Sequence, residues 1–258
     1  MSDLNLLFRN RIGIPHNEKI TFQNLDMVLE KTAKTIPFEN LCIIENRTKE
    51  ITKENIRSKI LEQNEGGLCY ELNTILYLFL YENGFHPTLV RGVTYNPMKK
   101  QWSETGNTHV VNLITQNGQD YLVDTGFGGN LPLKPVPLSG ETVISSNGQF
   151  RVESVESEHG DYLMYMKLNR IDEDWTIGYA FNSKVEVKTI DELNEVQKII
   201  IEHPDSAFNK KPLITKLTDN GNIILTDTSF TERVGSELNK EYIDVNRFNE
   251  IRKNYFKL

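Results

Sequence analysis

The chain contains 258 residues, which is enough for one large or two ordinary domains with a well-formed core. Its 38% hydrophobic and 25% charged residues exclude an intrinsically disordered chain. The formal net charge of −7 disfavours a general surface for nucleic acids or anionic membranes, because both partners would be repelled.

Two further features concern the cellular compartment. Two cysteines, Cys42 and Cys69, are too few for a disulfide scaffold and suit a reducing environment. The N-terminal sequence MSDLNLLFRNRIGIP carries early charges and lacks the apolar core of a signal peptide. The longest apolar stretch, near residues 75–81, is far shorter than the roughly 20 residues of a spanning helix. We therefore expect a cytoplasmic protein without membrane or nucleic-acid partners.

The first third of the chain is predicted to be helical. Residues at helical spacing indicate helices over 21–35, from 52 to the glycine pair at 66–67, and over 69–82. Ile36-Pro37 ends the first helix and Asn83-Gly84 ends the third. Apolar residues surround nearly all of the third helix, which indicates that it is buried.

From His86 onward the pattern changes to short β-rich runs separated by Gly, Asn and Pro turns. The runs cover residues 88–94, 109–115, 120–124 and 162–168. Asn117-Gly118 is the clearest hairpin turn. These features predict an antiparallel barrel or a curved sheet. After about Thr189 a helical segment returns, followed by strands near 213–217 and 222–226 and a short C-terminal helix.

Cys69 is a candidate nucleophile because it follows Gly66-Gly67 at the predicted start of the buried helix. Unpaired backbone N–H groups and the helix dipole favour a thiolate there, and the same N–H groups offer an oxyanion site. The glycines permit close backbone approach and are expected to leave room for a substrate beside the sulfur. A buried core cysteine is the alternative interpretation.

His109 and Asp124 are predicted to lie side by side. If Asn117-Gly118 is a two-residue turn, His109 faces Gly126, and Asp124 is its diagonal neighbour on the same side of the hairpin. Their Cβ atoms are then about 7–8 Å apart, within reach of an imidazole–carboxylate hydrogen bond. Together with Cys69 they would form a Cys–His–Asp triad. A histidine with a purely structural hydrogen bond is the alternative.

The remaining motifs exclude several kinds of site. The other histidines, which have no partner at metal-ligand spacing, are His16, His86, His159 and His203. Neither an HExxH motif nor paired CxxC motifs are present, so we expect no metal. Gly126–Gly129 matches neither standard nucleotide-binding loop, and there is no GxSxG elbow. This run either leaves a cleft wall open or forms a mobile turn.

At four places the sequence resembles the arylamine N-acetyltransferase family. The segments are Ile36-Pro37-Phe38-Glu39-Asn40-Leu41, Gly66-Gly67-Leu68-Cys69-Tyr70-Glu71-Leu72-Asn73, Thr108-His109 and Asp124-Thr125-Gly126-Phe127-Gly128. Their order and spacing fit across nearly the whole chain. Any one signature would be weak, whereas four in register make the resemblance specific.

The resemblance implies an α+β fold with a papain-like cysteine-triad core. An N-terminal helical bundle, residues 1–86, would carry the nucleophile. A central antiparallel β-barrel, residues 87–189, would carry the histidine and the aspartate. A C-terminal α/β lid would span residues 190–258.

The resemblance also implies the activity. Acetyl-CoA, a co-substrate, would acetylate Cys69, and the thioester would pass to an arylamine, arylhydrazine or N-hydroxyarylamine, as in xenobiotic metabolism. His109 would relay protons, and Asp124 would orient the imidazole. By analogy, the residues that contact the aromatic amine would be Phe38, Phe127 and Phe208, and those that contact the coenzyme would be Thr108, Gly126, Phe127 and Gly128. The protein would be a monomer or homodimer.

One residue departs from the family pattern. Members usually have Arg directly before the Gly-Gly pair, where it pairs with the acidic residue that is Glu39 here, but this chain has Glu65. Two carboxylates should repel one another and oppose thiolate formation at Cys69. We expect either a new local partner, Lys31 or Lys34, or a less stable and less active protein.

Other functions use the same residues. A thiol hydrolase or transglutaminase-like amidase needs the same triad, and an amide synthase would use a longer acyl donor. A scaffold that binds aromatic ligands without turnover is the non-catalytic alternative. Dependence on a thioester donor separates the acetyltransferase from the hydrolase or amidase.

Overall fold

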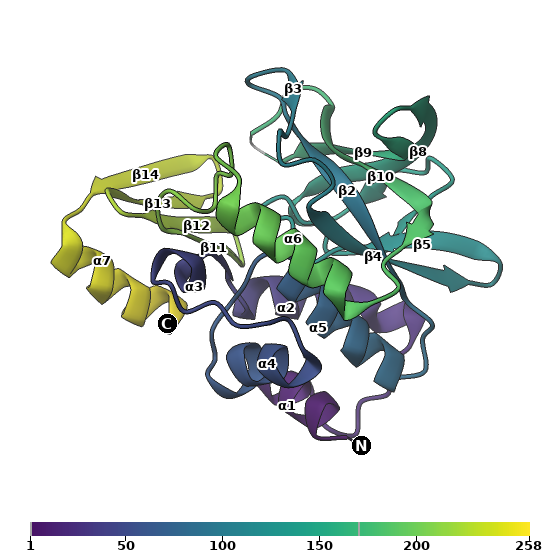
Figure 1. Ribbon diagram of the computed structural model, residues 1–258, viewed down its shortest axis with the longest axis horizontal. Coiled ribbons are helices and arrows are strands. Elements are labelled where there is room, and N and C mark those ends of the chain that lie inside the picture. Colours follow the sequence, from purple (N-terminus) through teal and green to yellow (C-terminus); the bar gives the residue numbers. More distant parts are fainter. Residues whose placement is uncertain (1, 170) are drawn as a thin grey trace.

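Helices from the first third of the chain support two antiparallel sheets in the computed structural model, which describes residues 2–169 and 171–258 (Figure 1). The helices are α1 (Asp3–Ile12), α2 (Leu25–Thr35), α3 (Leu41–Ile44), α4 (Lys53–Arg57) and α5 (Cys69–Glu82). The predicted bounds of α5 are confirmed. The helix that begins after Thr52 continues as a π-helical turn, Ser58–Glu62. It ends at Glu62, before the glycine pair at which we expected it to end.

Helix α5 lies at the centre of the largest hydrophobic core. Its apolar residues on several faces are almost fully buried, as the all-round apolar pattern predicted. Phe79 stacks on Phe8 of α1, with ring centroids 4.3 Å apart. The helix α6 (Ile190–Glu202) crosses α5 in Figure 1 and adds Leu193, Val196 and Ile200 to the same core. Packing along the whole length of α5 therefore fixes the position of its first residues.

The larger sheet forms the barrel-like part of the molecule. Its strands are β2 (Thr88–Asn96), β3 (Gln101–Trp102), β4 (His109–Gln116), β5 (Gln119–Val123), β6 (Val136–Pro137), β7 (Val143–Ile144), β8 (Gly148–Ser157), β9 (Gly160–Leu168) and β10 (Thr176–Glu186). They follow the order β6-β5-β4-β2-β10-β9-β8-β7, with β3 paired to β2. β6 also lies close to β8, which brings the two ends of this order together into a nearly closed barrel. The expected antiparallel barrel is confirmed.

The smaller sheet contains β11 (Leu213–Thr218), β12 (Gly221–Thr226), β13 (Ser229–Val234) and β14 (Glu237–Tyr242). Its first strand is β1 (Phe38–Glu39), which comes from the N-terminal third and pairs with β11. The C-terminal helix α7 (Val245–Ile251) packs on this sheet (Figure 1). A segment before α5 is thus joined to a sheet that follows the barrel in sequence.

The residue patterns did not predict α1, β8 or β10. No helix of the described residues is long and apolar enough to cross a membrane. Apart from α1, β8 and β10, the order of elements along the chain, first helical, then β and then mixed, follows the expectation. The molecule is therefore an α+β protein.

Candidate active site

Cys69 is the first residue of α5 and is buried, with 6% of its surface exposed. The preceding Leu68 is extended, and its N–H donates to the Glu71 carboxylate at 3.0 Å. This contact satisfies one of the backbone donors that a helix start leaves unpaired. The Cys69 thiol lies 3.4 Å from the carbonyl oxygen of Thr108, the residue before β4. The helix start therefore presents the sulfur to the barrel.

The hairpin of β4 and β5 has the predicted register. Gln116 faces Gln119 and Asn112 faces Val123, which is the pairing that a two-residue Asn117-Gly118 turn requires. His109 Nε2 lies 3.0 Å from Asp124 Oδ2, and both residues are almost fully buried. The diagonal relation between them is confirmed.

Asp124 accepts three more hydrogen bonds. Its Oδ1 receives the Asn73 amide at 2.8 Å and the Gly126 N–H at 2.7 Å, and its Oδ2 receives the Tyr179 hydroxyl at 2.9 Å. The ring of Tyr179 also packs on His109, with centroids 4.4 Å apart. These contacts fix the carboxylate in one orientation.

Sequence reasoning missed Asn73 and Tyr179 as parts of this site. Asn73 had a signal, because it is a polar residue one turn after Cys69 in a helix that is mostly apolar. Tyr179 had none, since nothing in the sequence indicates that β10 lies beside β2 and turns this side chain toward Asp124.

The buried charges of this site stabilise one another. Burial alone lowers the pKa of His109, but the Asp124 carboxylate, together with a hydrogen bond that the ring donates to the Cys69 sulfur, raises it to about 10. Burial would raise the pKa of Asp124, but His109, Asn73 and the Gly126 N–H hold it below its usual value. The imidazole is therefore protonated at neutral pH and faces an ionised carboxylate.

The second cysteine has a different environment. Burial, with Glu39 and Glu65 nearby, raises the pKa of Cys42 to about 12. Its thiol lies 3.3 Å from a Glu65 oxygen. Cys42 therefore stays protonated and is a poor nucleophile.

The three predicted aromatic residues are half-buried, and Phe127 contacts a residue of the candidate triad. Phe38 and Phe208 form an edge-to-face pair with ring centroids 5.6 Å apart. Asn40 fixes this pair, because its amide donates to the Phe208 carbonyl at 2.9 Å. The Phe127 ring lies 5.3 Å from the His109 ring. The structure thus brings aromatic surface close to the candidate triad.

The glycines have more specific roles than expected. A Cβ on Gly126 would lie 2.7 Å from the Cα of Cys69, so only glycine allows this close approach. Gly128 has a positive φ of 61° and lies beside Phe38. The expectation that Gly66 and Gly67 leave room for a substrate is wrong. The space a side chain would take there is filled by Pro37, Glu39 and Glu71.

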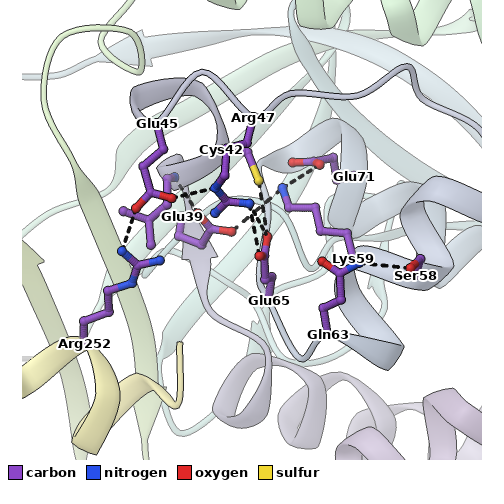
Figure 2. A network of polar contacts seen from close by, with 11 residues as sticks. Glu39, Cys42, Glu45, Arg47, Ser58, Lys59, Gln63, Glu65, Glu71 and Arg252 are labelled. Atoms are coloured by element: carbon purple, nitrogen blue, oxygen red, sulfur yellow. Dashed lines mark hydrogen bonds and ion pairs between the residues drawn. The ribbon is translucent and has the colours of Figure 1, made fainter. Parts of the chain in front are cut away.

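Glu65 has a partner that we did not expect. Arg47 Nη1 lies 3.2 and 3.5 Å from the two Glu65 oxygens (Figure 2). Lys31 and Lys34, the predicted partners, are engaged elsewhere. Lys31 donates to the Gly13 carbonyl, and Lys34 pairs with Glu30 and Asp219.

Glu39 lies close to a different cation, the Lys59 ammonium (Figure 2). Glu65 and Glu39 therefore do not form the unpaired carboxylate couple that the sequence suggested. In residues 2–169 and 171–258, no group of three or more His, Cys, Asp or Glu side chains forms a metal site.

Comparisons with known proteins identify the family of the chain. An N-acetyltransferase family model matches residues 21–258. The uncharacterized acetyltransferase YvcN of Bacillus subtilis is 39% identical over 240 residues, which cover 93% of this chain and 92% of that protein.

Two solved structures share the fold. The (BACCR)NAT3 arylamine N-acetyltransferase of Bacillus cereus, which has a unique Cys-His-Glu catalytic triad, is 39% identical with a TM-score of 0.95 over 100% of this chain and 99% of that one. The Mycobacterium marinum arylamine N-acetyltransferase in complex with CoA has a TM-score of 0.83 at 20% identity over 98% and 92% of the two chains. The chain therefore belongs to the arylamine N-acetyltransferase family of acyltransferases.

Proposed function

We propose that this protein transfers an acetyl group from acetyl-CoA to arylamines, arylhydrazines and N-hydroxyarylamines through an acetyl-Cys69 thioester. The observation that carries this proposal is the buried His109–Asp124 hydrogen bond of 3.0 Å, together with a hydrogen bond between Cys69 and the same imidazole. Because Asp124 occupies Nε2, the other ring nitrogen, Nδ1, is available to the thiol. A thiolate paired with an imidazolium is a strong nucleophile for a thioester.

In the first half-reaction the Cys69 thiolate attacks the acetyl carbonyl of acetyl-CoA. A bond forms between Sγ and the carbonyl carbon, the bond from that carbon to the coenzyme sulfur breaks, and His109 gives the leaving thiolate its proton. The backbone N–H groups at the start of α5 are the candidate donors to the developing oxyanion.

In the second half-reaction the amine attacks the acetyl-Cys69 thioester. The new C–N bond replaces the C–S bond, and neutral His109 takes the proton that the nitrogen loses. Asp124 keeps the ring oriented throughout and stabilises its charged form. An N-hydroxyarylamine reacts in the same way through its oxygen.

The residues around the thiol define two binding regions. The flat ring of the amine would lie against Phe38, Phe127 and Phe208, whose rings supply apolar surface. The coenzyme would pass along Thr108, Gly126, Phe127 and Gly128. The short contacts of Thr108 and Gly126 with Cys69 support this path.

Steady-state kinetics with acetyl-CoA and aniline test the proposal. A ping-pong route predicts parallel double-reciprocal lines when both substrates are varied. Cys69→Ser should abolish acetanilide formation, because the alkoxide is far harder to form than the thiolate. Cys42→Ser is the matched control and should retain the wild-type rate, since its protonated thiol contacts neither His109 nor Asp124.

The same assay distinguishes the alternatives. Continued release of CoA without an amine, beyond the one equivalent per protein that acetylation of Cys69 produces, would indicate a thiol hydrolase. Turnover only with longer acyl thioesters would indicate an amide synthase. No turnover with any thioester, in a folded protein, would contradict the enzyme function.

A further inference from the structure

Three charged side chains are buried together behind the Gly66-Gly67 pair. The Lys59 ammonium lies 2.7 Å from Glu71 Oε1 and 3.8 Å from Glu39 Oε1 (Figure 2). The exposed fractions of these side chains are 15% for Lys59, 9% for Glu71 and 1% for Glu39. We call these three residues the lysine cluster. None of them belongs to the candidate triad.

Each carboxylate of the cluster also holds a backbone N–H. Glu71 accepts from Leu68, the residue directly before Cys69, and Glu39 accepts from Leu41. The missing side chains of the glycine pair make this possible. A Cβ on Gly66 would lie 2.8 Å from Glu39 Cγ, and one on Gly67 would lie 2.8 Å from Glu71 Oε2.

The two segments that these carboxylates hold face one another. The Glu39 N–H donates to the Gly67 carbonyl at 3.0 Å, and the Gly67 N–H donates to the Pro37 carbonyl at 3.3 Å. Phe38 therefore lies opposite Gly67 in a short parallel bridge. One segment carries the aromatic residue of the proposed amine region, and the other leads into Cys69.

Lys59 is the cation between these segments. Burial lowers the pKa of Lys59, but Glu71 and Glu39 outweigh burial and raise it above the usual lysine value, so the side chain is charged. Burial raises the pKa of Glu39, and the nearby Glu71 carboxylate raises it further. Without Lys59, two carboxylates would be buried within reach of each other with no compensating charge.

A cavity of about 40 Å³ is lined by Lys59, Glu39, Glu71 and their neighbours. Cys69, His109 and Asp124 do not line it. The cluster therefore has no contact with the candidate triad through this cavity.

We propose that Lys59 is a positioning residue for acetyl transfer, which ties Glu39 and Glu71 together and so fixes Phe38 relative to Cys69. The proposal rests on the proposed function, because it gives Lys59 the task of placing the nucleophile. Lys59 does not touch the reacting atoms and acts through the two carboxylates.

The test compares Lys59→Met, Lys59→Arg and the control Lys53→Met. Lys53 forms an exposed ion pair with Glu82 in the same part of the molecule. Two rates at Cys69 are followed by mass spectrometry well below the melting temperature of each variant. One is single-turnover acetylation by acetyl-CoA, and the other is alkylation by iodoacetamide.

A positioning role predicts that Lys59→Met slows acetylation of Cys69 by about tenfold to hundredfold, the effect of a small misplacement of a reacting group. Alkylation slows as well, because an uncompensated carboxylate opposes the thiolate. Lys59→Arg recovers part of both rates by restoring the charge. Lys53→Met stays within about twofold of wild type, since exposed ion pairs contribute little.

Rates in Lys59→Met within twofold of wild type would overturn the proposal, even with a lower melting temperature. If Lys59→Met does not fold, Glu71→Gln decides. Its amide has a single acceptor oxygen: if that oxygen stays on the Leu68 N–H, an NH2 donor faces the Lys59 ammonium and this contact is lost, so we expect acetylation to slow at least threefold. Unchanged rates in Glu71→Gln overturn the proposal. If wild type is not acetylated, the proposed function fails, and the alkylation rates still decide the role of Lys59.

Discussion

Two buried groups of charged residues contact the beginning of α5, and they are built differently. In the first, Asp124 receives hydrogen bonds from His109, Asn73, Tyr179 and a backbone N–H. In the second, Lys59 joins two carboxylates that bind backbone N–H groups. The first group sets the charge of the imidazole. The second sets the path of the chain into α5.

The protein thus uses two different groups of residues, one for the protonation of His109 and one for the position of the chain that leads into Cys69. The Asp124 group is rigid through many donors on one carboxylate, so the loss of its charge changes the protonation of His109. The lysine cluster contains one cation and two carboxylates, so the loss of the cation changes packing around the glycine pair. Variants in each group should therefore affect different measured quantities.

The largest expected effect follows from Asp124→Asn. Asparagine keeps the shape but removes the negative charge that raises the pKa of His109 to about 10, so burial lowers that pKa and the ring is neutral at pH 7. Acetyl transfer should fall on the order of 10³-fold or more, as in other triads that lose this carboxylate.

The pH dependence of Cys69 alkylation tests whether the loss of activity in Asp124→Asn comes from the loss of the charge on His109. Iodoacetamide should alkylate Cys69 faster at pH 6 in wild type than in Asp124→Asn, because only the wild-type imidazole is charged there. The difference between the two rates should narrow as the pH approaches about 10, where the wild-type imidazole also becomes neutral. Equal alkylation rates at pH 6 would show that Asp124 does not control the charge of His109.

The smallest expected effect concerns the Glu65–Arg47 pair. These side chains are 21% and 38% exposed, and neither contacts the candidate triad. A double-mutant cycle with Glu65→Ala and Arg47→Ala should give a coupling free energy of unfolding of about 1 kcal/mol or less. Each single variant should lower the melting temperature by about 2–4 °C.

Acetylation of Cys69 should stay within twofold of wild type in both of these variants. This result would show that the partly exposed Glu65–Arg47 pair, unlike the buried lysine cluster, does not position Cys69. A large loss of acetylation rate would instead place Glu65 and Arg47 among the groups that position Cys69.

The parts of the site that the sequence predicts well depend on local spacing. The bounds of α5 follow from its apolar pattern and from the glycines on both sides. The contact between His109 and Asp124 follows from one turn, Asn117-Gly118, because a two-residue loop fixes the register of the whole hairpin.

The parts that the sequence does not predict depend on contacts between distant segments. Arg47 reaches Glu65 because α3 and the loop after it lie beside Glu65, which Cys42 also contacts, and no spacing rule encodes this arrangement. Lys59 points toward Glu71 from a π-helical turn, where the ordinary helical period does not apply. Tyr179 reaches Asp124 only through the pairing of β10 with β2.

The most direct test of the account is the mass of the intact protein after mixing with acetyl-CoA in the absence of an amine. We predict one acetyl group, located on Cys69 and not on Cys42 by peptide mapping, and complete release of this group when aniline is added. An acetyl group on another residue, or an unmodified folded protein that still acetylates aniline, would contradict the role of Cys69.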